Sequence, residues 1–96
     1  MPEELERAIE LIGGQVALLV LAALFEGPRR LSDLRTGLPD VDTIALLKRL
    51  YSLEESGLVR RQVLDPHRSV QVYEATKCAL EMRPALEALA LWASQP

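Results

Sequence analysis

Hydrophobic residues in the first third of the chain recur with the period of a helix. The spacing i, i+3, i+4, i+7 near the N-terminus predicts an amphipathic helix that ends at Gly13–Gly14, with apolar positions Leu5, Ala8, Ile9 and Ile12. Residues 15–26 are apolar nearly all round, which is typical of a buried central helix, and Gly27–Pro28 ends it. A short third helix is expected over residues 31–37.

A fourth helix is predicted over about residues 43–56. Asp42 is a suitable N-cap for it, and Gly57 is a suitable C-terminal stop. Its apolar residues fall on one side, at Leu46, Leu50 and Leu53.

The remainder of the chain predicts a hairpin and a last helix. Residues 58–64 and 70–75 are rich in β-branched side chains and flank Asp-Pro-His-Arg-Ser, a turn sequence. Residues 77–94 are expected to form one helix, with a stripe made of Cys78, Met82, Leu86, Leu89 and Ala93. Because Cys78 lies on this apolar stripe, we expect its thiol to be buried.

This order of elements predicts a mainly α fold with a two-stranded β-wing. Compact helices followed by a hairpin are typical of a winged helix-turn-helix domain, in which one helix enters the major groove of DNA. The recognition helix would span about residues 42–56, the wing about 58–75, and a single domain residues 1–96.

Length and composition narrow the class of protein. A chain of 96 residues fits one small core, and a single cysteine allows no intrachain disulfide. The longest apolar run, 16–25, is too short to span a membrane, and no signal peptide is recognisable, so we expect a cytoplasmic protein with no membrane contact.

Charge is distributed unevenly along an acidic chain. The net charge is −3, yet residues 29–77 carry nine Lys or Arg against seven Asp or Glu. The positive charge therefore lies in the predicted helix-turn-helix and wing, where a DNA surface would be. The sequence contains no recognisable catalytic arrangement, metal-ligand set or cofactor motif, so we expect no enzyme activity, metal or cofactor.

Several segments together resemble the HxlR-type, MarR-related transcriptional regulators. They are LIGGQVALLVL at 11–21, EGPRRLSDLR at 26–35, LP at 38–39, RLYSLEESGLV at 49–59, Tyr73 with Thr76, and Pro84 with Trp92. The resemblance covers about residues 5–93 and implies a homodimeric winged-helix protein that binds double-stranded DNA and regulates transcription.

The chain departs from the family pattern in several places, two of which bear on function. Family members usually carry a cysteine near the N-terminus, and the corresponding position here is about Glu3. In the recognition helix, the family's capping residue, lysine and hydroxyl residue are replaced by Asp42, Ile44 and Leu47. Because apolar side chains cannot hydrogen-bond to phosphates or base edges, this helix is atypical, and weak DNA binding is expected.

The fold and resemblance leave two functions open. In the first, the chain is a DNA-binding regulator whose contact residues are Arg29, Arg30, Thr43, Lys48, Arg49 and Arg68. In the second, the winged helix has lost specific DNA binding and contacts another protein through Ile44 and Leu47, if these are exposed.

A homodimer is expected through the first and last helices. The last helix carries more apolar surface than one face of so small a monomer can bury. The expected interface residues are Leu5, Ile9, Leu86, Leu89 and Trp92.

Overall fold

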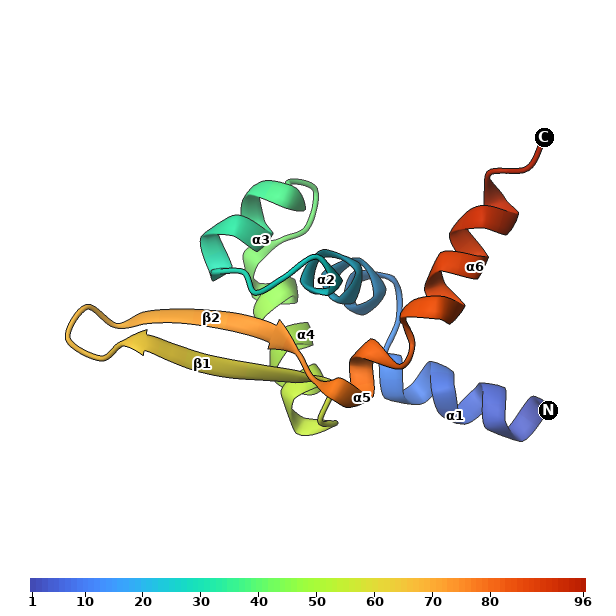
Figure 1. Cartoon of the computed structure of the whole chain (residues 1–96), viewed down its shortest axis with the longest axis horizontal. Coiled ribbons are helices and arrows are strands. Elements are labelled where there is room, and N and C mark those ends of the chain that lie inside the picture. The colour runs from blue at the N-terminus through green and yellow to red at the C-terminus, as the bar shows by residue number, and fades with distance from the viewer.

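The computed structural model describes all of residues 1–96, and it has the predicted fold class. Four helices come first: α1 (Pro2–Ile12), α2 (Gln15–Phe25), α3 (Leu31–Gly37) and α4 (Thr43–Glu55). They are followed by β1 (Val59–Asp65), β2 (Val70–Ala75), α5 (Lys77–Leu80) and α6 (Arg83–Ala93). Figure 1 shows the hairpin extending from one end of the molecule and α1 and α6 projecting from the other.

Helix α2 lies at the centre and supplies the largest share of the core (Figure 1). Its residues Ala17, Val20 and Leu21 are completely buried. They pack in one cluster with apolar side chains of α3, α4, β1 and α5, namely Leu34, Leu46, Leu50, Leu53, Val59 and Ala79. Full burial of one such leucine stabilises the fold by about 1.5–3 kcal/mol, so this cluster holds α4 firmly against α2.

The wing is an antiparallel pair with one irregularity. Cα partners run from Val59–Ala75 to Val63–Gln71, and the register then shifts so that Asp65 pairs with Val70. The loop that precedes α3 adds a single bridge to the outer side of β2, between Arg29 and Tyr73. The wing is therefore joined by backbone hydrogen bonds to the segment that leads into the helix-turn-helix.

The C-terminal segment contradicts the prediction of one helix over 77–94. The chain forms the short helix α5, turns at Glu81 and Met82, and begins α6 at Arg83. Pro84 lies in the first turn of α6, where its missing N–H is tolerated, but inside a continuous helix it would remove a hydrogen bond and clash with the preceding turn.

The break also changes the environment of the cysteine. The predicted burial of Cys78 is wrong: its side chain is exposed, and the neighbouring Ala79 occupies the core position of α5. The predicted stripe assumes one continuous helix through Pro84, whereas the turn before α6 resets the helical phase. Of that stripe only Met82 and Leu86 pack against the core.

No single helix has both the length and the apolar character needed to cross a membrane. Helices α1 and α2 reach these limits only when taken together, and the chain bends by 77° between them.

Candidate nucleic-acid interface

Helix α4 has one buried side and one exposed side. Leu46, Leu50 and Leu53 face the core, as their spacing predicted. On the exposed side lie large apolar side chains: Ile44 is 63% exposed, Leu47 41% and Tyr51 65%. Lys48 and Arg49 are also exposed on this helix, so its outer surface combines apolar groups with positive charge.

The first turn of α4 is fixed by its own N-cap. The Asp42 carboxylate accepts hydrogen bonds from the backbone N–H of Ile44 at 3.1 Å and of Ala45 at 3.2 Å, which confirms the predicted cap. At the other end, Gly57 adopts a φ of +79°, the left-handed conformation that favours glycine after a helix. Thr43, at the first helical position, is half-buried and lines a surface recess with Ser32, Arg35 and Thr36 of α3.

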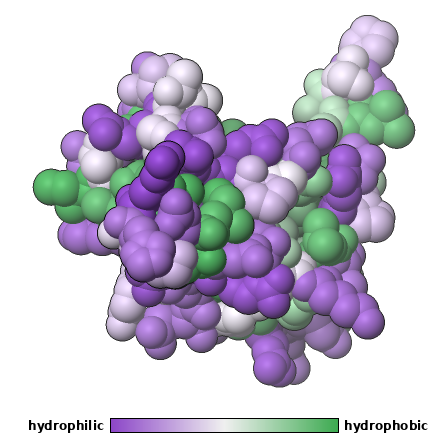
Figure 2. Space-filling view, turned by 60° about the vertical axis from the view of Figure 1, so that its left-hand side comes forward, coloured by the Kyte–Doolittle hydropathy of each residue, from purple (hydrophilic) through white to green (hydrophobic).

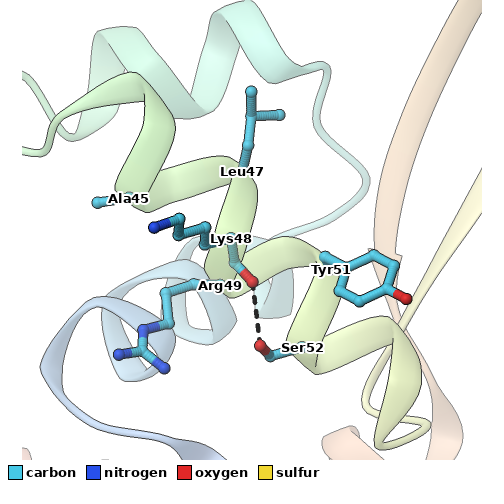
Figure 3. Close-up of a pocket in the computed structure, with 6 residues that line it drawn as sticks. All are labelled: Ala45, Leu47, Lys48, Arg49, Tyr51 and Ser52. Carbon is cyan, nitrogen blue, oxygen red and sulfur yellow. Dashed lines mark hydrogen bonds between the residues drawn. The ribbon is translucent and has the colours of Figure 1, made fainter.

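The exposed side chains of α4 do not all point the same way. Figure 3 shows Leu47 and Tyr51 on one side of the helix, and Lys48 and Arg49 on the other. Arg49 extends toward the N-terminal part of the chain, where its Nη1 atom lies close to Gly13, the C-cap of α1. A cation beside the last carbonyls of a helix is favourable, so this position gives Arg49 a structural role of its own.

The two arginines before α3 behave differently from each other. The Arg29 guanidinium folds back and donates hydrogen bonds to the carbonyls of Gly27 at 3.2 Å and Pro28 at 3.0 Å. Arg30 is exposed and its guanidinium forms no hydrogen bond: its backbone N–H donates to the Asp33 carboxylate at 3.0 Å, and its carbonyl accepts from the Leu34 N–H at 3.1 Å. Arg30 therefore keeps its charge free for another partner.

A basic groove lies between the start of α3 and the wing. Arg30 and Ser32 line it on one side, and Arg68, Ser69 and Gln71 of the wing line it on the other. Arg68 makes only a loose ion pair with Asp65, 3.7 Å long and largely exposed to solvent. Because exposed pairs of this kind contribute little free energy, Arg68 is available to a stronger anion.

Other cations of the wing are held by carboxylates. Arg60 pairs with Glu74 across the strands, and Arg61 Nε lies 2.8 Å from Glu54 Oε1 at the end of α4. Arg30, Arg35, Lys48 and Arg49 form no ion pair. These four lie on or beside α3 and α4, in the segment whose net charge is positive, whereas Arg7 of α1 and Lys77 of α5 are unpaired elsewhere.

Sequence reasoning missed Tyr51 and the polar residues of α3. Tyr51 lies four residues after Leu47, so helical spacing could have placed it on the exposed side of α4. A hydrogen bond to Glu55 and the negative charge of that carboxylate raise the pKa of Tyr51 above its ordinary value. Ser32 and Arg35 gave no signal in the sequence, because their role depends on the packing of α3 beside Thr43.

Figure 2 shows the wing side of the molecule as a mainly hydrophilic surface interrupted by separate hydrophobic patches.

No group of three or more His, Cys, Asp or Glu side chains is placed to hold a metal ion.

The terminal helices present a second apolar surface, away from the wing. Neither α1 nor α6 contains a buried residue. Of the predicted interface residues, Leu86 packs partly against the chain's own core. The other four are exposed, namely Leu5, Ile9, Leu89 and Trp92, the last by 71%.

These features define a winged helix-turn-helix domain. The HxlR-like helix-turn-helix family matches residues 11–96, and the chain belongs to this family. It is 35% identical over 83 residues to the HTH-type transcriptional regulator YkvN of Bacillus subtilis, a match that covers 86% of this chain and 70% of YkvN. The HTH-type transcriptional regulator YodB of the same organism is 27% identical, over 99% of this chain and 85% of YodB.

Solved structures agree with this assignment. The chain superposes on the HTH-type transcriptional regulator YtcD with a TM-score of 0.88 and 27% identity, over 94% of this chain and 92% of YtcD. The quinone-bound structure of B. subtilis YodB gives a TM-score of 0.82 and 26% identity, over 98% and 99% of the two chains. The chain is a transcriptional regulator with a helix-turn-helix fold, as the resemblance implied.

Proposed function

We propose that the chain is a single domain that acts as a homodimeric, non-enzymatic, DNA-binding regulator in the cytoplasm. Two observations carry the proposal: the exposed side of α4 bears the unpaired Lys48, and a basic groove lies between the start of α3 and the wing. In winged-helix proteins the recognition helix enters the major groove, while the wing reaches toward the backbone.

Phosphate contacts would supply most of the affinity. Arg30 and Arg68 face each other across the groove, and Lys48 adds a charge on α4 itself. Thr43 adds a hydroxyl beside Arg35. Arg29 contributes less, because its guanidinium already donates hydrogen bonds to two backbone carbonyls, and Arg49 contributes less because it extends toward Gly13. Asp42 adds a negative charge that repels phosphates, so we expect weak binding. The expected dissociation constant for non-specific DNA is about 10⁻⁴ to 10⁻⁶ M at physiological salt.

The apolar surfaces of α1 and α6 support the homodimer. Exposed leucine, isoleucine and tryptophan side chains on two helices are unusual for a monomer, and large aromatic residues are favoured in interface cores. Figure 1 places both helices at the end of the molecule opposite the wing tip, so pairing there would leave both recognition helices free.

The exposure of Ile44 and Leu47 also meets the requirement of a protein-interaction patch. The relatives of this chain are described as transcriptional regulators, and none of these descriptions supports a protein-interaction module. We therefore propose DNA as the partner of α4.

The salt dependence of DNA binding tests this proposal. Arg30→Ala and Arg68→Ala should each weaken binding and reduce the slope of log K against log salt by about 1 per protomer. Lys77→Ala is the matched control, because Lys77 is exposed and unpaired on α5, and it should leave both quantities unchanged. Equal effects of all three substitutions would contradict the proposed surface.

A further inference from the structure

The exposed side of α4 carries two branched apolar side chains in its first two turns. Ile44 and Leu47 are 63% and 41% exposed, and both follow directly on the capped N-terminus. We propose that Ile44 and Leu47 read the 5-methyl groups of thymine in the major groove. This inference rests on the proposed function and adds to it the base that is recognised.

The chemistry of the two side chains restricts what they can recognise. Neither isoleucine nor leucine donates or accepts a hydrogen bond. Thymine is the one base that presents a methyl group in the major groove, and apolar side chains contact it there. Beside the amino group of cytosine the same side chains would leave a donor unpaired, which is unfavourable. Ile44 and Leu47 therefore favour T·A pairs over C·G pairs at the positions that they contact.

The residues around Ile44 and Leu47 are complementary to a DNA groove, which has a phosphate backbone on each side. On the α3 side, Ser32, Arg35 and Thr36 line a recess next to Thr43. On α4 itself Lys48 is exposed and forms no ion pair. An apolar centre with cations and hydroxyls around it is complementary to thymine methyls flanked by phosphates, and this charge complementarity favours DNA over an apolar protein partner.

The cap of α4 fits the same picture. The Asp42 carboxylate, which would repel a phosphate, is turned onto the N–H groups of Ile44 and Ala45. These hydrogen bonds hold the backbone of the first turn in place. Because a β-branched side chain in a helix strongly prefers one χ1 rotamer, Ile44 loses little conformational freedom when it meets a methyl group.

Uracil substitution tests the inference with the unaltered protein. A duplex that the protein selects from a random pool is made in two forms, one with thymine and one with uracil, which lacks only the methyl group. Each buried methyl contributes about a fourfold change in affinity, so two or more contacts should weaken uracil-duplex binding by about tenfold or more. The salt slope should stay the same, because the phosphates are identical.

Variants locate the effect on α4. Ile44→Ala with Leu47→Ala should bind both duplexes equally, whereas Ile44→Val keeps branched methyl groups and should retain most of the discrimination. Leu19→Ala is the matched control, because Leu19 lies on α2 and is about as exposed as Leu47, at 42% against 41%. This substitution should leave the discrimination between thymine and uracil intact.

The outcomes separate this inference from the proposed function. Salt-dependent binding with equal affinity for thymine and uracil duplexes would overturn the inference and leave the proposed function standing. Absence of binding to either duplex would overturn both, as expected for a helix that contacts a protein instead.

Discussion

Arg29 and Tyr73 exchange both of their backbone hydrogen bonds, with N···O distances of 2.9 and 2.7 Å. Arg29 lies in the loop before α3, and Tyr73 lies in the middle of β2. The bridge joins the wing to the segment that leads into α3, next to the groove that Arg30 and Arg68 line. Cations from both sides of this groove can then meet phosphates, which are regularly spaced along a DNA strand.

The N-cap of α4 gives a prediction about stability. Asp42→Ala removes the acceptor of two backbone N–H groups and should lower the free energy of unfolding by about 1 kcal/mol. Asp42→Ser preserves an N-cap acceptor and should change stability much less. Urea unfolding measures both, and an alanine variant as stable as the unaltered protein would show that the cap is not needed.

The terminal helices give a prediction about assembly. The unaltered protein should be a dimer at tens of micromolar, a concentration chosen as an order of magnitude for an obligate dimer. Trp92→Glu should yield monomers, because it places a charge in an apolar contact. Tyr51→Glu, at a residue of similar exposure on α4, should remain dimeric. Light scattering distinguishes the cases, and a monomeric unaltered protein would contradict the proposed interface.

The atypical helix gives a prediction about affinity. Asp42→Ser, Ile44→Lys and Leu47→Thr together remove one negative charge and add one positive charge beside the groove. The triple variant should bind DNA more tightly and with a steeper salt slope, but lose the preference for thymine over uracil. Since Ile44 and Leu47 are exposed, folding should be preserved. A variant that fails to fold would show that these residues support the core.

The single cysteine gives a prediction about redox sensitivity. Because Cys78 is exposed, a thiol reagent should label it readily in the folded protein. It lies on α5, far from the wing tip (Figure 1), and α5 carries none of the proposed contact residues. The unaltered protein and Cys78→Ser should therefore bind DNA with the same affinity before and after oxidant treatment. A change of binding on oxidation that the serine variant abolishes would establish a redox switch.

Sequence reasoning succeeded where local signals decide the structure. Asp42 sets the start of α4 through its N-cap, and Gly57 follows the end of α4 in a left-handed conformation. The turn sequence around His67 separates the two strands. Reasoning from periodicity failed at Pro84, where the signal was present but the apolar stripe was counted through it.

Other features depend on packing between distant segments. The Arg29–Tyr73 bridge joins residues far apart in the chain, and the direction of Arg49 depends on where α1 ends. No pattern of neighbouring residues encodes either of them. The candidate residues were therefore predictable as a basic segment, but not their division into free and engaged cations.

Binding to the DNA upstream of the protein's own gene, measured by mobility shift at about 50 and 200 mM salt, tests the central claim most directly. If three cations from each protomer of a dimer meet phosphates, affinity should fall about a thousandfold between these salt concentrations. Absence of a mobility shift at the lower salt, or a DNA affinity that does not change with salt, would contradict the assignment of α4 and the wing as a DNA-binding surface.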